Sequence, residues 1–362
     1  MTKVVEPKLA PWWDGSVGKT QTISNTTPST KPDAEKDRPP LANDIEIVRN
    51  PSPKLYKEII PKLVADEGWD NSLHCYEIWL RSVGQENFSL WCAIDKRFNR
   101  IVGTMSRCTY LPKKPGDIHF TQFSMLYLQP EYRGLGLGRK LYDPAYEETR
   151  DTNIFCYGVE AMWRKYAKDY GFDKYPHWQL IALKANCSDA RLDKLGDPDP
   201  SVELRDWRRV SLDDIFLYNR RLTDGVNRES YIVQALNHPE SVTLVAVSGS
   251  SNTVVGMCQV RELVLKRIGI SLFYADSEKI AKTLLRATIE RFVDSQCKKI
   301  TDFTQLVYKT PSVNENSLKL FSSLVDEKIT HREALVTQFT HKILNWPVGL
   351  IYSIADEHSG LV

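Results

Sequence analysis

One stretch predicts more of the architecture than any other, Leu126-Tyr127-Leu128-Gln129-Pro130-Glu131-Tyr132-Arg133-Gly134-Leu135-Gly136-Leu137-Gly138-Arg139-Lys140-Leu141. An apolar run leads into a turn and then into a loop with three glycines in five residues. Because glycine has no Cβ, several backbone N–H groups of this loop can point at one spot. The helix expected after the loop adds unpaired N–H groups and the positive end of its dipole. We therefore expect a strand, a cradle for a pyrophosphate, and a helix.

The spacing of the glycines excludes two common nucleotide-binding loops. A P-loop would close with Gly-Lys-Ser or Gly-Lys-Thr, which this loop lacks. The dinucleotide fingerprint G-x-G-x-x-G does not fit either. The pattern that fits is Arg133-x-x-Gly136-x-Gly138 after a strand and Pro130. It resembles the acetyl-CoA loop of the GCN5-related N-acetyltransferases (GNATs), and the alternative is a glycine-rich turn without a ligand.

The elements around this loop follow an order that also resembles the GNAT fold. Over residues 44–185, hydrophobic periodicity predicts a strand, two helices, three strands, a helix, a strand, a helix and a strand. The strands are expected at 44–48, 88–94, 100–110, 118–128, 153–159 and 178–185, and the helices at 55–67, 72–83, 136–149 and 160–170. The resemblance implies that the fourth and fifth strands splay apart and that acyl-CoA enters the gap. It also implies strand-like pairing of the acyl-CoA with the backbone near Leu126, Tyr127 and Leu128.

The second half of the chain repeats this order but lacks the glycine loop. After the strand expected at 268–274 the sequence continues Ala275-Asp276-Ser277-Glu278, where Asp276 is predicted to cap the next helix. Two carboxylates at that place would repel a pyrophosphate. We therefore expect a GNAT-like domain that does not hold acyl-CoA in the usual way, as in the two-domain GNAT branch that the sequence resembles. This domain either buttresses the first one or forms a wall that selects the acceptor.

The predicted fold class is α/β (α+β), with two tandem GNAT-like domains that each contain a mixed, mostly antiparallel twisted sheet flanked by helices. Residues 1–43 are rich in Pro, Thr, Ser, Lys and Asp and are predicted to be disordered. Within them, Trp12-Trp13 is either a docking element or part of a weakly ordered tail. The acetyltransferase domain is expected at 44–188, a polar linker at 189–202, and the second domain at 203–362.

Composition narrows the classes of protein further. The net charge of +2, from 48 basic and 46 acidic residues, favours neither a nucleic-acid partner nor a membrane surface. The seven cysteines form no CxxC pair, so we expect reduced core thiols in an intracellular, cytoplasmic protein. The seven histidines show no ligand spacing, and no metal is expected. No secretory signal is recognised, and no apolar run reaches the ~18 residues of a membrane span.

Acyl transfer to an amine requires a polarised carbonyl, a neutral amine and a proton for the leaving thiolate. In GNATs, a tyrosine on the helix after the fifth strand often supplies that proton. Tyr166 is the candidate here, with core packing as an alternative of equal weight. Glu160, where the fifth strand meets that helix, is a candidate base or else a helix cap.

Candidates for the acceptor pocket are Trp69, His74 and Tyr157, although each of these residue types is more often structural. The two-domain branch often carries an acidic residue where Cys75 stands and another where Tyr157 stands. These departures imply a different acceptor or a weakened activity.

Together these features predict an acetyl-CoA-dependent N-acetyltransferase that acts on a small-molecule or peptide amine. The alternative is a non-catalytic acyl-CoA-binding or protein-interaction module built on two GNAT folds. The residues expected to bind acyl-CoA are Leu126, Tyr127, Leu128, Arg133, Gly134, Leu135, Gly136, Leu137, Gly138 and Arg139.

Overall fold

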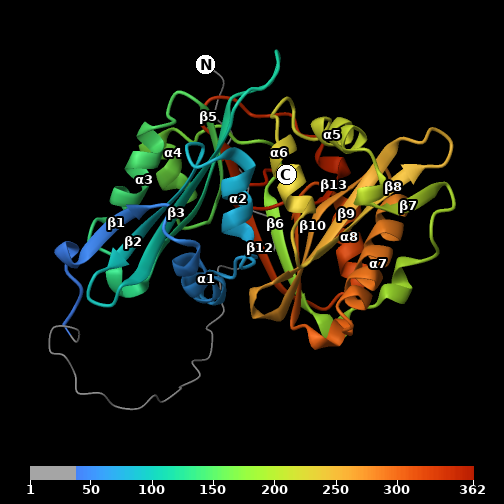
Figure 1. The fold of residues 1–362 in the computed structure, drawn as a ribbon, viewed down its shortest axis with the longest axis horizontal. Coiled ribbons are helices and arrows are strands. Elements are labelled where there is room, and N and C mark those ends of the chain that lie inside the picture. The colour runs from blue at the N-terminus through green and yellow to red at the C-terminus, as the bar shows by residue number, and fades with distance from the viewer. Residues whose placement is uncertain (1–37) are drawn as a thin grey trace.

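The structure of this chain, a computed structural model, describes residues 38–362 (Figure 1). The predicted disordered tail falls outside the described residues except for 38–43, and so do Trp12 and Trp13. Two halves lie side by side, the earlier elements on the left of Figure 1 and the later ones on the right. Between them run strands β6 (Leu180–Asn186) and β12 (Ile329–Phe339).

The first half contains the elements that the sequence predicts, within a few residues at each end. They are β1 (Ile45–Arg49), α1 (Pro53–Glu67), α2 (Cys75–Val83), β2 (Phe88–Asp95), β3 (Arg100–Tyr110), β4 (Phe120–Leu128), α3 (Leu137–Glu147), β5 (Asn153–Gly158) and α4 (Trp163–Tyr170). The ends follow local chemistry. Ser52 caps α1 by accepting from the Leu55 N–H, and Gly68 ends it in the left-handed conformation, φ 75°.

The second half repeats the order. Its further elements are β7 (Val202–Asp206), α5 (Leu212–Arg220), α6 (Glu229–Leu236), β8 (Ser241–Ser248), β9 (Val254–Leu263), β10 (Arg267–Ala275), α7 (Glu278–Ser295), β11 (Gln305–Pro311), α8 (Glu315–Leu324) and β13 (Ile351–Ser353). One local prediction is wrong: Ser277, not Asp276, caps α7, because its hydroxyl accepts from the Ile280 N–H at 3.2 Å.

The strands form one 13-stranded sheet in the order β1-β2-β3-β4-β5-β12-β6-β11-β10-β9-β8-β7, with β13 paired to β10. The first half therefore does not close on its own last strand. β12 pairs with β5 through residues 336–339 and with β6 through residues 329–335. β6, expected as the last strand of the first unit, pairs instead with β11 and β12. The domain division at 189–202 stays a prediction, and backbone pairing crosses it.

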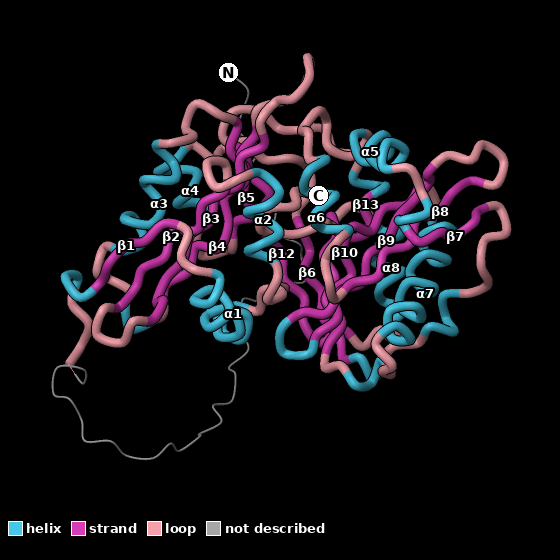
Figure 2. Tube along the Cα trace, viewed as in Figure 1, coloured by secondary structure: helices cyan, strands magenta, loops and turns pink. Residues whose placement is uncertain are grey.

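Helices cover both faces of this sheet (Figure 2). In the first half, α3 and α4 pack on one face around Phe123 and Phe172, and α1 and α2 pack on the other. In the second half, α7 and α8 cover one face. The other face carries α5 and α6, whose side chains join those of α1 and α2 in one large core. The two halves thus share a hydrophobic core between these four helices.

Each half contains a pair of parallel strands that separate. β4 and β5 pair only through residues 120–122 and 153–155. Beyond that point Met125 has a φ of 57°, and the register of β4 against β3 shifts there. The second half repeats this arrangement, since β10 and β11 pair through 268–270 and 306–308 and Leu272 has a φ of 43°. The splayed strands predicted for the fold are therefore present twice.

The second splay is filled by the chain itself. β13 lies against β10, with Phe273 opposite Ser353 and Tyr274 opposite Ile351. The N–H of Ile354 then donates to the carbonyl of Lys309 on β11, at 2.9 Å. A strand of the protein thus occupies the backbone edge that an acyl-CoA would need in this half. In the first half, β3 pairs with one edge of β4 along its length. Within the described residues, no strand pairs with the other edge, the one that faces β5, beyond Gln122.

All seven cysteines are free thiols, and six of them are buried. Among residues 38–362, no helix has the length and apolar character that would let it cross a membrane.

Candidate functional site

The glycine loop lies between β4 and α3, at the open end of the first splay. Gly134 and Gly136 have φ values of 85° and 74°, a conformation that disfavours any residue with a Cβ. A Cβ built on either glycine would meet no atom within 4 Å, and one on Gly138 would only touch Leu128 at 3.8 Å. The space above the loop is therefore open, and the conformation of the loop is one that requires glycine.

The backbone donors of this loop are free. Among the described residues, none accepts a hydrogen bond from the backbone N–H groups of residues 134–139, and α3 has no side-chain cap. By contrast, the equivalent helix α7 is capped by its own Ser277. An open loop with unpaired donors at a helix N-terminus suits an anion such as a pyrophosphate. The residues present therefore fit an acyl-CoA.

Two arginines of the predicted site flank the loop. Arg133 donates from Nε to the carbonyl of Leu128 at 3.0 Å, and its NH2 lies 3.8 Å from Glu67. Burial raises the pKa of Glu67, and this weakens the ion pair between its carboxyl group and Arg133. Arg139 is largely exposed, with Asp169 at 4.0 Å. Both side chains are loosely held and close to the free N–H groups.

The predicted strand contacts lie along the unpaired edge of β4. Leu126 and Leu128 are partly exposed on the face of α3 and α4. Tyr127 points to the opposite face, where its hydroxyl donates to Asp66 at 2.6 Å. The alternation places apolar side chains toward the loop and a polar contact toward α1.

The two residues predicted to catalyse proton transfer have different contacts. Tyr166 stacks on Tyr142 of α3 with ring centroids 5.6 Å apart and is partly exposed. Burial raises the pKa of its hydroxyl above the usual range of tyrosine. Glu160 accepts hydrogen bonds from Trp163 and Arg164, both at 3.1 Å. Glu160 lies before the N-cap of α4, Met162, and its partners are side chains rather than N–H groups of the helix backbone, so it does not cap α4. Its role as a base stays a prediction.

Two of the three predicted acceptor residues meet a segment that was not expected there. This segment, residues 354–362 after β13, is buried throughout. Trp69 packs against its His358 with ring centroids 5.3 Å apart, and Tyr157 donates to the carbonyl of Leu361 at 3.2 Å. His74 lies apart from these residues, facing His238 and Glu240.

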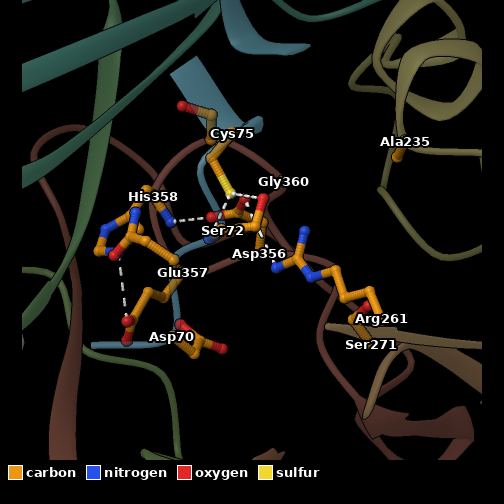
Figure 3. A network of polar contacts seen from close by, with 12 residues as sticks. Asp70, Ser72, Cys75, Ala235, Arg261, Ser271, Asp356, Glu357, His358 and Gly360 are labelled. Carbon is orange, nitrogen blue, oxygen red and sulfur yellow. Dashed lines mark hydrogen bonds and ion pairs between the residues drawn. The ribbon is translucent and has the colours of Figure 1, made fainter. Parts of the chain in front are cut away.

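Residues 354–362 also carry a cluster of ionisable side chains (Figure 3). Asp70, Glu357 and His358 have donor atoms within 4.8 Å of one another. Lys309 already joins the two carboxylates, at 2.6 Å from Asp70 and 2.5 Å from Glu357. The expectation of no metal stays a prediction, and the ammonium group of Lys309 already pairs with two of these three side chains.

Charge in this cluster is set by burial and by Lys309. Burial opposes ionisation of Asp70, but Lys309 holds the pKa of Asp70 well below its usual range. Burial raises the pKa of Glu357, against the pull of the same lysine. On the other side, Arg261 extends from β9 toward Asp356, 3.9 Å away, as Figure 3 shows.

No pattern in the sequence alone predicts that residues 354–362 are buried between the two halves. A short polar run follows β13 in the sequence, Asp356-Glu357-His358-Ser359-Gly360, and such runs are usually loops at the surface. Its burial depends on side chains from both halves. Tyr110, Gln122, Arg228 and Tyr274 all hydrogen-bond its backbone.

Comparison with solved structures defines the class of fold. A tandem GNAT protein from the clavulanic acid biosynthesis pathway has a TM-score of 0.56 at 14% identity, covering 83% of this chain and 99% of that one. A protein from Pyrococcus horikoshii described as a candidate acetyltransferase has a TM-score of 0.58 at 15% identity, covering 88% and 96%. Saccharomyces cerevisiae N-myristoyltransferase has a TM-score of 0.53 at 12% identity, covering 94% and 93%. The chain therefore has the two-domain GNAT fold, as its sequence predicts.

At the level of sequence, the chain belongs to the family described as "Protein of unknown function (DUF1248)", whose model matches residues 42–222. That match covers the whole glycine loop and the strands that splay beside it. No curated protein sequence matches the chain.

Proposed function

We propose that this protein is an acyl-CoA-dependent N-acetyltransferase with one active site, in its first half. The observation that supports this most is the open glycine loop, whose N–H groups have no partner within residues 38–362. They lie at the mouth of a splay that no strand in this range fills. The structural neighbours named as GNAT and N-myristoyltransferase proteins support acyl transfer as the class of reaction.

The residues of this chain have separate tasks in the proposal. The backbone of 134–139 holds the pyrophosphate, and Arg133 and Arg139 add positive charge beside it. The edge of β4 near Leu126, Tyr127 and Leu128 aligns the pantetheine arm. When bound, acyl-CoA supplies an activated acyl carbonyl. A backbone N–H of β4 beside Met125, where φ is positive, is the proposed donor that polarises that carbonyl.

Proton transfer and acceptor binding fall to the two faces of the sheet. Tyr166, on the face of α3 and α4, is the proposed proton donor to the sulfur. Trp69 and Tyr157, on the opposite face, line the proposed acceptor side together with residues 354–362. The second half contributes this wall, while its own splay is occupied by β13.

Isothermal titration with coenzyme A tests the binding part of the proposal. We expect one molecule per chain, because β13 fills the second splay and no strand of residues 38–362 fills the first. A thiol-release assay with acetyl-CoA and a panel of primary amines then tests transfer. Binding without thiol release would favour the non-catalytic acyl-CoA-binding module, and absence of binding would overturn the proposal.

A further inference from the structure

Ser124 has a special position on the splayed strand. It directly precedes Met125, the residue with positive φ, and faces the side of the sheet that carries α1 and α2. Ser124 is partly exposed, whereas Phe123 and Met125 on either side are each only 2% exposed. Ser124 therefore places a hydroxyl beside the proposed acyl site, at a partly exposed position of β4.

The hydroxyl of Ser124 has a partner from the other half of the protein. Its oxygen lies 2.6 Å from Nδ1 of His358. The other ring nitrogen of His358, Nε2, lies 3.1 Å from Oδ1 of Asn71. Because a carbonyl oxygen only accepts, Nε2 must carry the hydrogen and Nδ1 must be the acceptor. Ser124 therefore donates its proton to His358, and the lone pairs of its oxygen point elsewhere.

The surroundings of His358 keep it neutral and fixed. Burial lowers its pKa to about 3, with Lys309 and Arg261 acting in the same direction and Asp70 against them. Glu357 faces it from its own segment, 3.3 Å from Nε2. The rings of Trp69 and Trp79 pack on it from α1–α2, at 5.3 and 5.7 Å.

The segment that carries His358 is a permanent part of the core. Leu361 and Val362 are both 0% exposed. Gln122, two residues before Ser124, accepts from the Leu361 N–H at 3.1 Å and donates to the Glu357 carbonyl at 2.8 Å. Displacing such a segment would expose its apolar side chains to water. Residues 354–362 therefore form a fixed wall of the acceptor side and not a segment that moves out to admit the acceptor.

We propose that Ser124 contacts the acceptor amine and that His358 is the positioning residue that orients its hydroxyl. With its proton directed to Nδ1 of His358, the oxygen of Ser124 accepts a hydrogen bond from an N–H of the neutral amine and aims the nitrogen at the splay. This inference rests on the proposed function. It adds that the second half completes the acceptor site of the first with a side chain, which gives that half a direct role.

Kinetics of single and double variants test the inference. Ser124→Ala should lower kcat/KM for amine acetylation about tenfold, the effect of one lost hydrogen bond. His358→Ala should cause a similar loss, and His358→Asn a smaller one because its amide oxygen can replace Nδ1 as acceptor. The double variant Ser124→Ala/His358→Ala should be no slower than Ser124→Ala alone. Additive losses would overturn the proposed route through Ser124.

His238→Gln provides a matched control. His238 forms a similar buried pair with Ser72, at 2.8 Å, in the same core but away from β4. We expect kcat/KM to stay within twofold of the unaltered protein in this variant. An equal loss in His238→Gln and His358→Ala would show a general effect of core damage and overturn the inference. Thermal shifts with coenzyme A should be unchanged in all these variants.

The ring tautomer of His358 gives a readout that does not depend on turnover. In protein with ¹⁵N-labelled histidine, the signal that disappears in His358→Asn should show a neutral ring with the hydrogen on Nε2. A hydrogen on Nδ1 would overturn the inference while leaving the proposed function intact. If the unaltered protein neither binds coenzyme A nor releases thiol with any amine, the proposed function fails and the inference fails with it.

Discussion

The hydroxyl of Ser124 and Nδ1 of His358 lie 2.6 Å apart, although 234 residues separate them in the chain. Ser124 belongs to the strand whose splay receives the proposed acyl donor. His358 belongs to a segment that leaves the second splay and enters the core between the halves. The first splay and the second one, which β13 fills, are thus connected by one piece of chain. This connection explains how a half without a glycine loop can still contribute to a single site.

Substitution of Gly136 by alanine should selectively abolish binding of coenzyme A. Its φ of 74° and the open space above it mean that a Cβ costs about 1 kcal/mol of folding stability and projects toward the bound pyrophosphate. Gly116→Ala is the control, since Gly116 has a φ of 90° and equally open space but lies in the loop before β4. Titration calorimetry should show at least tenfold weaker binding for the first variant only. Equal affinities would place the pyrophosphate elsewhere.

Removal of the Tyr166 hydroxyl should slow acyl transfer without weakening acyl-CoA binding. Tyr166→Phe keeps the ring that stacks on Tyr142 and removes the proposed proton donor, so kcat should fall by about 10²-fold. Tyr170→Phe on the same helix is the control, because its hydroxyl is held by Asp143 at 2.7 Å. Single-turnover thiol release measures both. If the two variants behave alike, Tyr166 is a packing residue.

Stability should fall as the pH decreases below about 6.5, the ordinary pKa of histidine. Burial lowers the pKa of His238 to about 2 and that of His358 to about 3. Between these values and 6.5 the unfolded chain binds more protons than the native one, so stability rises with pH through this window. At pH 5 the two histidines together should lower the free energy of unfolding by ~4 kcal/mol relative to its value at neutral pH.

The check is urea unfolding of the unaltered protein and of the variant His238→Gln/His358→Gln between pH 5 and 7. The charged groups that face His358 are Asp70, Lys309, Arg261 and Glu357, and all of them are retained in the variant. The pH dependence of the variant should therefore be shallower by the contribution of two histidines. An unchanged slope would mean that neither ring is held neutral in the native state.

Loss of the Lys309 charge should strongly destabilise the protein. Lys309→Met leaves the carboxylate of Asp70 without its ionic partner and the carboxyl group of Glu357 without its hydrogen-bond donor, which should cost ~3–5 kcal/mol. Lys319→Met removes an exposed lysine 3.4 Å from Glu315 and should change stability by less than ~1 kcal/mol. Denaturant midpoints at pH 7 measure both effects. A small effect at Lys309 would mean that water reaches the cluster.

Local patterns predicted the elements well. β3 has the predicted bounds, 100–110, and β4 and α3 differ from theirs by two residues or fewer at each end. Such elements depend on periodicity and on caps a few residues away. Tyr166 was placed on the right helix, whereas Glu160 lies before α4 and not in its first turn. Whether Tyr166 donates a proton or only packs could not be resolved from spacing, since both roles depend on tertiary neighbours.

The strand, glycine loop and helix of residues 126–141 follow from the amino acids of that stretch alone, because the φ values near Gly134 and Gly136 and the free helix N-terminus are local properties. Tertiary structure alone reveals three things about the site: β12 lies next to β5, β13 fills the second splay, and residues 354–362 bring His358 to Ser124. Each of these depends on contacts between residues far apart in the chain. Hydrophobic periodicity shows that a segment will be buried on one face, but it does not show which distant strand or side chain will cover it.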